Sequence, residues 1–285
     1  MLRLITILIF LCSAALAQDV RPFATYASAS SAILNDPHDL AFGPDGNLYI
    51  ADKFANRVAI LDPDSLELIG SIGEEEVPGA HDVSFGPDGR LYVSATGLSA
   101  VVVYDLSGAV PVRDAVLTQF SRTEGLLAHS NGQLYVMASG TGDLVALADE
   151  RSVVAIASGM VGAHDVAEAP DGTIWVADNF QRRLVQFTPE LEQINVISGE
   201  KYGFVGPRYM DFNLAGHLFV ADQDAHRILK IDPISGVLLG VIGTGLPGNG
   251  PNVFDDPEGV AVRGTEHFFA DSDNNRIVKY IVALN

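Results

Sequence analysis

The sequence has almost no cysteine and few basic residues. One cysteine, Cys12, occurs among 285 residues, and 17 Lys and Arg residues stand against 36 Asp and Glu residues. The formal net charge is −19. Nucleic acid binding requires clustered Lys and Arg, because the phosphate backbone must be neutralised. We therefore expect no nucleic acid partner.

Long apolar runs are also missing, apart from a short one at the N-terminus. The run LITILIFLCSAAL follows the basic start MLR and is too short to span a bilayer as a mature helix. Ala15, Leu16 and Ala17 form a small-x-small cleavage pattern. We predict a signal peptide over residues 1–17, a single domain over 18–285 with no membrane span, and a secreted or periplasmic location.

The position of Cys12 bears on disulfides and lipidation. It lies inside the predicted signal peptide, after Leu11, which is too large for the small residue expected ahead of a lipid-modified cysteine. The mature chain would then contain no cysteine, so the fold must be stabilised by packing without disulfides. We expect a monomer.

What the sequence does contain is one unit repeated six times. Each copy has two short apolar runs joined by a turn, then a third run and, in most copies, a fourth. Units of about 40 residues with four short strands are typical of β-propeller blades. The copies begin NDPHDLAFGPDGNLYIAD, VPGAHDVSFGPDGRLYVSA, RTEGLLAHSNGQLYVMA, VGAHDVAEAPDGTIWVAD, VGPRYMDFNLAGHLFVAD and DDPEGVAVRGTEHFFAD. The sequence therefore predicts an all-β fold, a six-bladed β-propeller of four-stranded blades.

The two ends of the repeat array complement each other. The sixth unit stops after RIVKYIVAL without a fourth strand, and residues 20–29, VRPFATYASA, form a β-prone segment that belongs to no unit. We predict that this N-terminal strand completes the last blade and so removes two exposed sheet edges.

One column of the alignment is ionisable in every copy. It opens the first strand of each unit, and its residues are His38, His81, Glu124, His164, Arg208 and Glu258. The first strand of a blade is the innermost, so these six side chains should face one another at a mouth of the axial channel.

Imidazoles and carboxylates that converge in this way can bind a divalent transition metal, with zinc the first expectation. We predict His38, His81, His164 and Glu258 as ligands. The following aspartates, Asp39, Asp82 and Asp165, would orient the imidazoles or bind calcium deeper in the channel. In the alternative interpretation these side chains are simply solvated, the aspartates cap strand starts, and Arg208 neutralises Glu124 and Glu258.

Other polar residues fit a structural role better. Asp52, Asp178, Asp222 and Asp271 each precede an arginine by five residues, and we expect each pair to bridge the turn between the second and third strands of its blade. We expect Trp175 and the tyrosines of the LY dipeptides in the core. The remaining histidines are predicted to lie at the surface: His129, His217, His226 and His267.

The unit resembles the NHL repeat. The resemblance is carried by DSDNNRIVKY at 271–280 and DKFANRVAIL at 52–61, together with a proline-containing start to the first strand. It covers essentially all of the predicted mature chain and implies a β-propeller. It does not by itself imply one function, because NHL propellers include enzymes and binding modules.

The segments PHDL, AHDV and AHDV are similar to the catalytic domain of peptidyl-α-hydroxyglycine α-amidating lyases. That resemblance implies zinc at His38, His81 and His164 and calcium at one or more of the aspartates that follow them. It also implies that Arg208 grips a carboxylate or stabilises negative charge, and that Tyr209 is a general base if a neighbouring cation lowers its pKa. This chain departs from the family in having its histidines on the first, second and fourth blades and in lacking disulfide cysteines.

Two functions remain open on the sequence. The first is an exported metal-dependent lyase or hydrolase for a small polar or peptide substrate, in which Arg208 fixes an anion and Glu124 or Tyr209 moves a proton. The second is a non-catalytic propeller that binds a peptide, glycan or protein. Imidazole tips within reach of one point would favour the enzyme.

Overall fold

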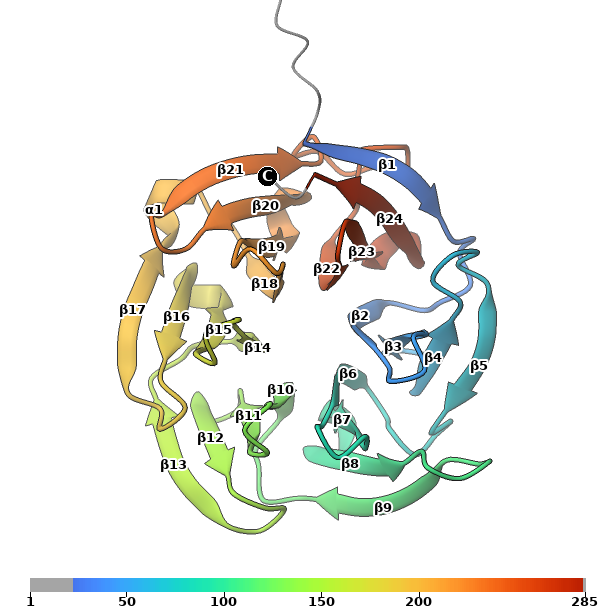
Figure 1. Cartoon of the computed structure of the whole chain (residues 1–285), viewed down its shortest axis with the longest axis vertical. Helices are drawn as coiled ribbons and strands as arrows, with labels where there is room; N and C mark the ends of the chain where they lie inside the picture. The colour runs from blue at the N-terminus through green and yellow to red at the C-terminus, as the bar shows by residue number, and fades with distance from the viewer. Residues whose placement is uncertain (1–22, 284–285) are drawn as a thin grey trace, which may run out of the picture.

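The computed structural model describes residues 23–283 and shows six four-stranded antiparallel sheets arranged as a ring (Figure 1). This confirms the predicted all-β, six-bladed β-propeller. The predicted signal peptide, residues 1–17, lies outside the described residues. Within them, no helix is long and apolar enough to cross a membrane.

The first five blades each run in chain order from an innermost to an outermost strand. Their strands are β2 (Pro37–Phe42), β3 (Leu48–Asp52), β4 (Arg57–Leu61), β5 (Leu68–Ile72); β6 (Ala80–Phe85), β7 (Leu91–Ala95), β8 (Ala100–Asp105), β9 (Val112–Leu117); β10 (Thr123–Ala128), β11 (Leu134–Ala138), β12 (Asp143–Leu147), β13 (Val153–Ser158); β14 (Ala163–Glu168), β15 (Ile174–Asp178), β16 (Arg183–Phe187), β17 (Gln193–Ser198); β18 (Pro207–Phe212), β19 (Leu218–Asp222), β20 (Arg227–Asp232) and β21 (Val237–Ile242).

The sixth blade is assembled from both ends of the chain. It contains β22 (Pro257–Arg263), β23 (Glu266–Asp271) and β24 (Arg276–Val282), and β1 (Ala24–Ala29) pairs antiparallel with β24 as its outermost strand. Figure 1 shows β1 beside β24, closing the ring. The predicted closure by an N-terminal strand is therefore confirmed, and the edge of β24 is covered.

Helical structure is confined to short segments between strands. These are the α-helical turn α1 (Gly199–Tyr202) and the 3₁₀ turns η1 (Thr96–Leu98), η2 (Asn179–Gln181), η3 (Gln223–Ala225) and η4 (Ser272–Asn274). The 3₁₀ turns connect the second strand of a blade to the third. They hold that connection close to the channel mouth.

Each of the four Asp–Arg pairs bridges the turn predicted for it. The arginine Nε or Nη atom lies 2.7 or 2.8 Å from the carboxylate in Asp52–Arg57, Asp178–Arg183, Asp222–Arg227 and Asp271–Arg276. The aspartates are fully buried, and each also accepts a backbone N–H from the segment that leads into the first strand of the same blade. The repeated pair is thus a structural device that fixes where the first strand enters the channel.

The hydrophobic core is divided between the blades. Among the described residues six apolar clusters are present, and each packs one blade against the next around the ring. Trp175 is buried between the fourth and fifth blades, and the tyrosines of the LY dipeptides are buried as well, as predicted. This packing fixes the positions of the inner strands, so their side chains meet on the axis at defined distances.

Candidate metal centre and channel mouth

The six ionisable residues of the predicted column all open an innermost strand. Figure 1 shows β2, β6, β10, β14, β18 and β22 nearest the axis. Arg208 is partly exposed. The other five residues are buried, with relative exposures between 0% and 4%: His38, His81, Glu124, His164 and Glu258. The mouth is therefore a packed polar cluster, and the expectation of simply solvated side chains does not describe it.

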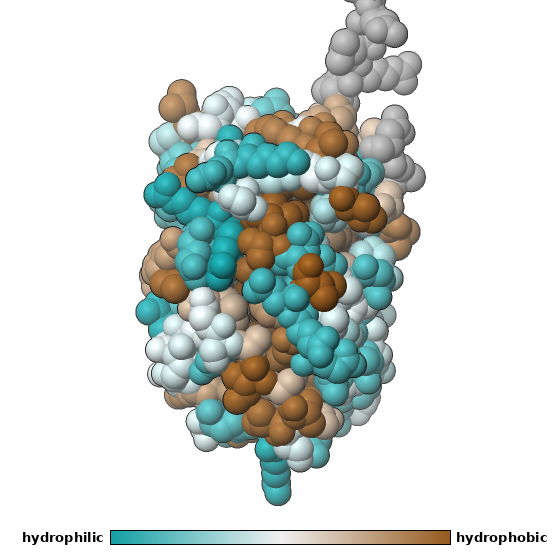
Figure 2. Space-filling view, turned by 90° about the vertical axis from the view of Figure 1, so that its left-hand side faces the viewer, coloured by the Kyte–Doolittle hydropathy of each residue, from teal (hydrophilic) through white to brown (hydrophobic). Residues whose placement is uncertain are grey.

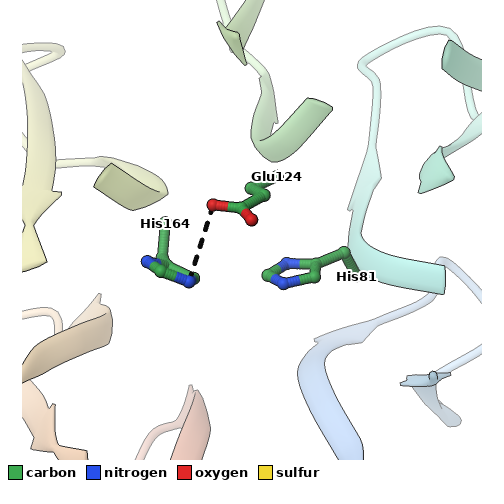
Figure 3. Close-up of side chains that lie close together, drawn as sticks. All are labelled: His81, Glu124 and His164. Carbon is green, nitrogen blue, oxygen red and sulfur yellow. Dashed lines mark ion pairs between the residues drawn. The ribbon is translucent and has the colours of Figure 1, made fainter. Parts of the chain in front are cut away.

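The first cluster at the mouth contains His81, Glu124 and His164 (Figure 3). One ligand atom from each lies within 4.8 Å of the others, and His164 Nε2 is 3.5 Å from Glu124 Oε2. Ligands of a tetrahedral zinc ion are about 3.3 Å apart, from metal–nitrogen distances near 2.0 Å. The cluster therefore needs adjustments of about 1 Å to hold a metal.

Hydrogen bonds fix the tautomers of both imidazoles in this cluster. His164 Nδ1 donates to the backbone carbonyl of Gly162 at 2.7 Å, which leaves the Nε2 lone pair facing Glu124. Tyr209 Oη lies 2.8 Å from the backbone carbonyl of His81 and 2.8 Å from His81 Nδ1. Since the hydroxyl has one hydrogen, it donates to the carbonyl and accepts from Nδ1–H. His81 Nε2 is then free to bind a metal, the arrangement that ligating histidines require.

Burial keeps these two histidines neutral. It lowers the pKa of His81 and of His164 well below the usual value, and the positive charge of Arg208 acts in the same direction. A neutral imidazole is the form that binds a metal ion. Burial therefore keeps both imidazoles of the first cluster in the form that can donate a lone pair to a metal, and Glu124 is the negative charge of the cluster, with Arg122 Nε 2.8 Å from its Oε1.

The second cluster contains His38, which lies outside the first. His38 Nδ1 is 2.7 Å from Glu258 Oε2, and His38 Nε2 is 2.8 Å from Lys53 Nζ and 3.3 Å from Asp36 Oδ2. Sequence analysis identified neither Lys53 nor Asp36. The two clusters adjoin, because the rings of His38 and His81 are 4.3 Å apart between centroids.

The two clusters are built from the same sequence module on opposite sides of the ring. Glu124–Gly125 of the third blade faces His164 of the fourth, and Glu258–Gly259 of the sixth faces His38 of the first. A Cβ atom would lie 2.4 Å from the carbonyl oxygen of His164 at Gly125 and 2.2 Å from that of His38 at Gly259. Glycine is therefore required for the close approach that places each glutamate beside its histidine.

Arg208 lies on the fifth blade, next to the second cluster. Its Nε is 3.6 Å from Glu258 Oε2 and makes no hydrogen bond within the described chain, and an Nη atom donates to Gln223. Gln223 in turn donates to Glu258 and Asp256. Arg208 lines a polar cavity of about 370 Å³ at the mouth, together with Asp36, Lys53 and Glu258 of the second cluster.

The environment of Tyr209 does not lower its pKa. Burial raises that pKa well above the usual value, and the opposing effect of Arg208 is smaller. The condition under which Tyr209 could be a general base is therefore not met in this geometry. Its hydrogen bonds give it a positioning role at His81 instead.

The aspartates one step deeper tie neighbouring blades together. Each accepts a backbone N–H from the next inner strand: Asp39 from Val83, Asp82 from Leu126 and Asp165 from Met210. With Asp211, which sequence analysis missed, they line a cavity of about 300 Å³ on the channel axis. Burial raises the pKa of Asp39 to about 6 and those of Asp82 and Asp165 well above the usual value. Neither of the two candidate metal clusters in residues 23–283 includes them.

Two of the four histidines predicted at the surface are buried, so that prediction is wrong for them. His129 is 2% exposed, because it accepts from the backbone N–H of Asn131 and its Nε2 meets the carbonyl of Gly172 on the next blade. His267 is 1% exposed and packs on Phe219, with 4.3 Å between ring centroids. Short-range backbone partners and a neighbouring aromatic ring offset the cost of burying these imidazoles.

Comparison with known proteins identifies one repeat and the fold. A family model for the NHL repeat matches residues 34–61. No curated protein matches the sequence significantly.

Solved structures with a similar fold belong to proteins of different activity. The virginiamycin B lyase of Staphylococcus aureus has 12% identity and a TM-score of 0.64 over 90% of this chain and 99% of its own. The PQQ-bound aldose sugar dehydrogenase of Streptomyces coelicolor has 13% identity and a TM-score of 0.67 over 91% and 98%. A Bacteroides thetaiotaomicron protein of unknown function has 15% identity and a TM-score of 0.71 over 88% and 70%. The chain is thus a six-bladed β-propeller that carries an NHL repeat, and its structural neighbours are propellers.

Proposed function

We propose that the protein is an exported, metal-dependent lyase or hydrolase that acts on a small polar substrate at the channel mouth. The observation that carries this proposal is the first cluster, in which two neutral imidazoles with fixed tautomers meet a buried carboxylate. Zinc is the metal that His81, Glu124 and His164 would suit best. When bound there, it would supply Lewis acidity toward an oxygen atom of the substrate.

The residues around the cluster have complementary tasks. Tyr209 orients His81, and Glu124 completes the ligand set, so neither is free to move a proton. Arg208 lines the polar cavity beside the second cluster, and its guanidinium group would bind an anionic group of the substrate there. Carboxylate oxygens are the donor type suited to calcium, and we propose calcium as a structural ion of the channel, bound by the inner aspartates Asp39, Asp82 and Asp165 that line the axial cavity.

The comparisons support catalysis only through the fold. Virginiamycin B lyase shares the propeller, and a histidine-to-alanine variant of that enzyme is described as catalytically inactive with quinupristin bound. A lyase on this fold can therefore depend on a histidine.

The first test is metal content, measured by elemental analysis on untagged protein after exposure to zinc and calcium. We expect close to one transition metal per chain, lost in His81→Ala, His164→Ala and Glu124→Gln and retained in the control His217→Gln, whose residue lies outside both clusters. A chelator-sensitive lyase or hydrolase activity on small polar substrates should follow the metal. Protein that binds no metal under these conditions would refute the proposal.

A non-catalytic binding role is the second candidate, and one observation favours it. The outermost strands β13 and β17 expose apolar side chains, including Val154 and Ile156 at 54% and 57% and Ile194 at 52%. Figure 2 views this side of the molecule, where apolar patches are interspersed with hydrophilic ones. A partner bound by an edge strand would depend on these residues and not on His81 or His164, which separates the two functions experimentally.

A further inference from the structure

The two clusters at the mouth share a histidine and a glutamate but differ in the atom that a nearby cation contacts. In the first cluster Arg122 Nε lies 2.8 Å from Glu124 Oε1, a carboxylate oxygen, whereas in the second a lysine contacts an imidazole nitrogen. The second cluster, Asp36, His38 and Glu258, also satisfies the distance requirement for a metal site. It holds the ammonium group of Lys53, with Nζ 2.8 Å from His38 Nε2 and 3.0 Å from Asp36 Oδ2. These are distances of direct hydrogen bonds to atoms that would otherwise be metal ligands.

We infer that Lys53 takes the place of a second metal ion at the mouth, so that the protein binds one transition metal, at His81, Glu124 and His164, and not at His38. This inference rests on the proposed function for the metal of the first cluster. It departs from the amidating-lyase resemblance, which implies zinc at all three histidines.

The proton arrangement at His38 supports the inference. An ammonium group can only donate, so Nε2 of His38 must accept from Lys53. Nδ1 then carries the hydrogen and faces Glu258 Oε2 at 2.7 Å. Both ring nitrogens are engaged, and the imidazole has no lone pair left for a metal. In the first cluster His81 and His164 each keep theirs.

The charges of the second cluster are also balanced in part by the lysine. Without Lys53 the cluster would contain two carboxylates and an imidazole, a donor set that binds zinc. The ammonium group of Lys53 is covalently attached to the chain, so it cannot leave the cluster as a metal ion can. A metal ion entering there would meet both the ammonium group and, because the rings of His38 and His81 are 4.3 Å apart, the charge of the first metal.

Lys53 also occupies an unusual place in the repeat. It directly follows the last residue of the second strand, and in three other blades this position is Thr96, Ser139 or Ser272. Each of those hydroxyl groups donates to the carbonyl of the first residue in the next blade's innermost strand. The lysine side chain has no hydroxyl group for this hydrogen bond to the next blade and extends to the mouth. The first blade therefore lacks this structural hydrogen bond and places a cation at the mouth.

The test is the stoichiometry of zinc binding, measured by titration calorimetry and by elemental analysis. Wild type should bind one zinc ion and Lys53→Met two, because methionine keeps the length of the side chain but removes the charge. Lys53→Arg keeps the charge and should remain at one. The double variant Lys53→Met/His38→Ala should return to one. Circular dichroism and thermal unfolding confirm that each variant is folded.

The possible results separate this inference from the proposed function. Three results would each overturn the inference. Wild type and Lys53→Met could both bind one zinc ion, wild type could bind two, or His38→Ala could lose the ion that wild type binds. No ion in wild type but one in Lys53→Met would refute the metal-dependent function, and it would support the part of the inference that assigns Lys53 the place of a metal ion. No ion in either protein would overturn both.

Discussion

Tyr209 Oη lies 2.8 Å from His81 Nδ1 and 2.8 Å from the backbone carbonyl of the same residue. The hydroxyl belongs to the fifth blade and the histidine to the second, on the opposite side of the axis. One buried side chain therefore spans the channel and holds a candidate metal ligand by both its ring and its backbone. A substitution of the tyrosine separates this positioning role from a catalytic one.

Tyr209→Phe should weaken zinc binding by about 10- to 100-fold, the usual cost of removing a group that orients a metal ligand. The ring remains in the core, so the fold should be retained. Titration calorimetry measures the affinity. Tyr135→Phe is the matched control, because Tyr135 is equally buried but hydrogen-bonds to the carbonyl of Pro189, away from the mouth. Equal affinities in Tyr209→Phe and wild type would exclude the positioning role.

The fold could be predicted from the sequence because the same pattern of apolar strands and turns recurs in each unit. Alternating apolar residues, the PDG turns and the missing fourth strand of the last unit all indicate one architecture, and β1 occupies the position that this argument gave it. The column through His38 and His81 could be placed at the mouth for the same reason. Repetition turns a weak local pattern into a strong one.

The division of that column into two clusters could not be predicted. It depends on rotamers and on contacts across the ring that involve residues outside the column, such as Lys53 and Tyr209. A signal for Lys53 was present, since it is the ionisable exception in a position otherwise filled by Ser, Thr, Asn or Gln. The burial of His129 was missed because its partners, Asn131 and Gly172, are backbone groups that no side-chain pattern reveals.

The buried aspartates that end the second strands should affect stability and not metal binding. Asp222 accepts the backbone N–H groups of Val205 and Gly206 at 2.8 Å and pairs with Arg227. Asp222→Ala leaves all three donors without their acceptor, so we expect a loss of about 3–5 kcal/mol in the free energy of unfolding. Chemical denaturation measures this loss.

Asp224→Ala is the control for Asp222→Ala, because Asp224 lies two residues further along the same turn and is exposed. It should change stability by less than about 0.5 kcal/mol. A similar loss in both variants would show that the buried acceptor is not the cause.

The inner carboxylates should make the protein less stable as the pH rises. Carboxylates that are paired in the folded state usually have the opposite effect. Asp211 is partly buried, and desolvation, with the charge of Asp39, raises its pKa to about 7 although the backbone N–H groups of Phe212 and Val262 donate to it. The unfolded chain has a pKa near 3.9 at this group. Between these two values the folded protein binds more protons than the unfolded one, so the contribution of Asp211 to stability is lost as the pH rises through 7.

Asp211→Asn removes this charge penalty. The amide oxygen can still accept from Val262, and the hydrogen bond from the backbone N–H of Phe212 to the other oxygen is lost, which offsets part of the gain. At pH 8 the variant should be more stable than wild type by about 1–4 kcal/mol, the upper value being three pKa units of linkage. At pH 4 the carboxyl group is protonated in the folded state and close to its pKa in the unfolded state, so the difference should nearly vanish. Urea denaturation at both pH values tests this expectation, with Asp64→Asn as the exposed control. A variant less stable than wild type at pH 8 would mean that the charge is compensated by a bound cation, which calcium titration of the wild type would then reveal as a stabilisation lost in Asp211→Asn.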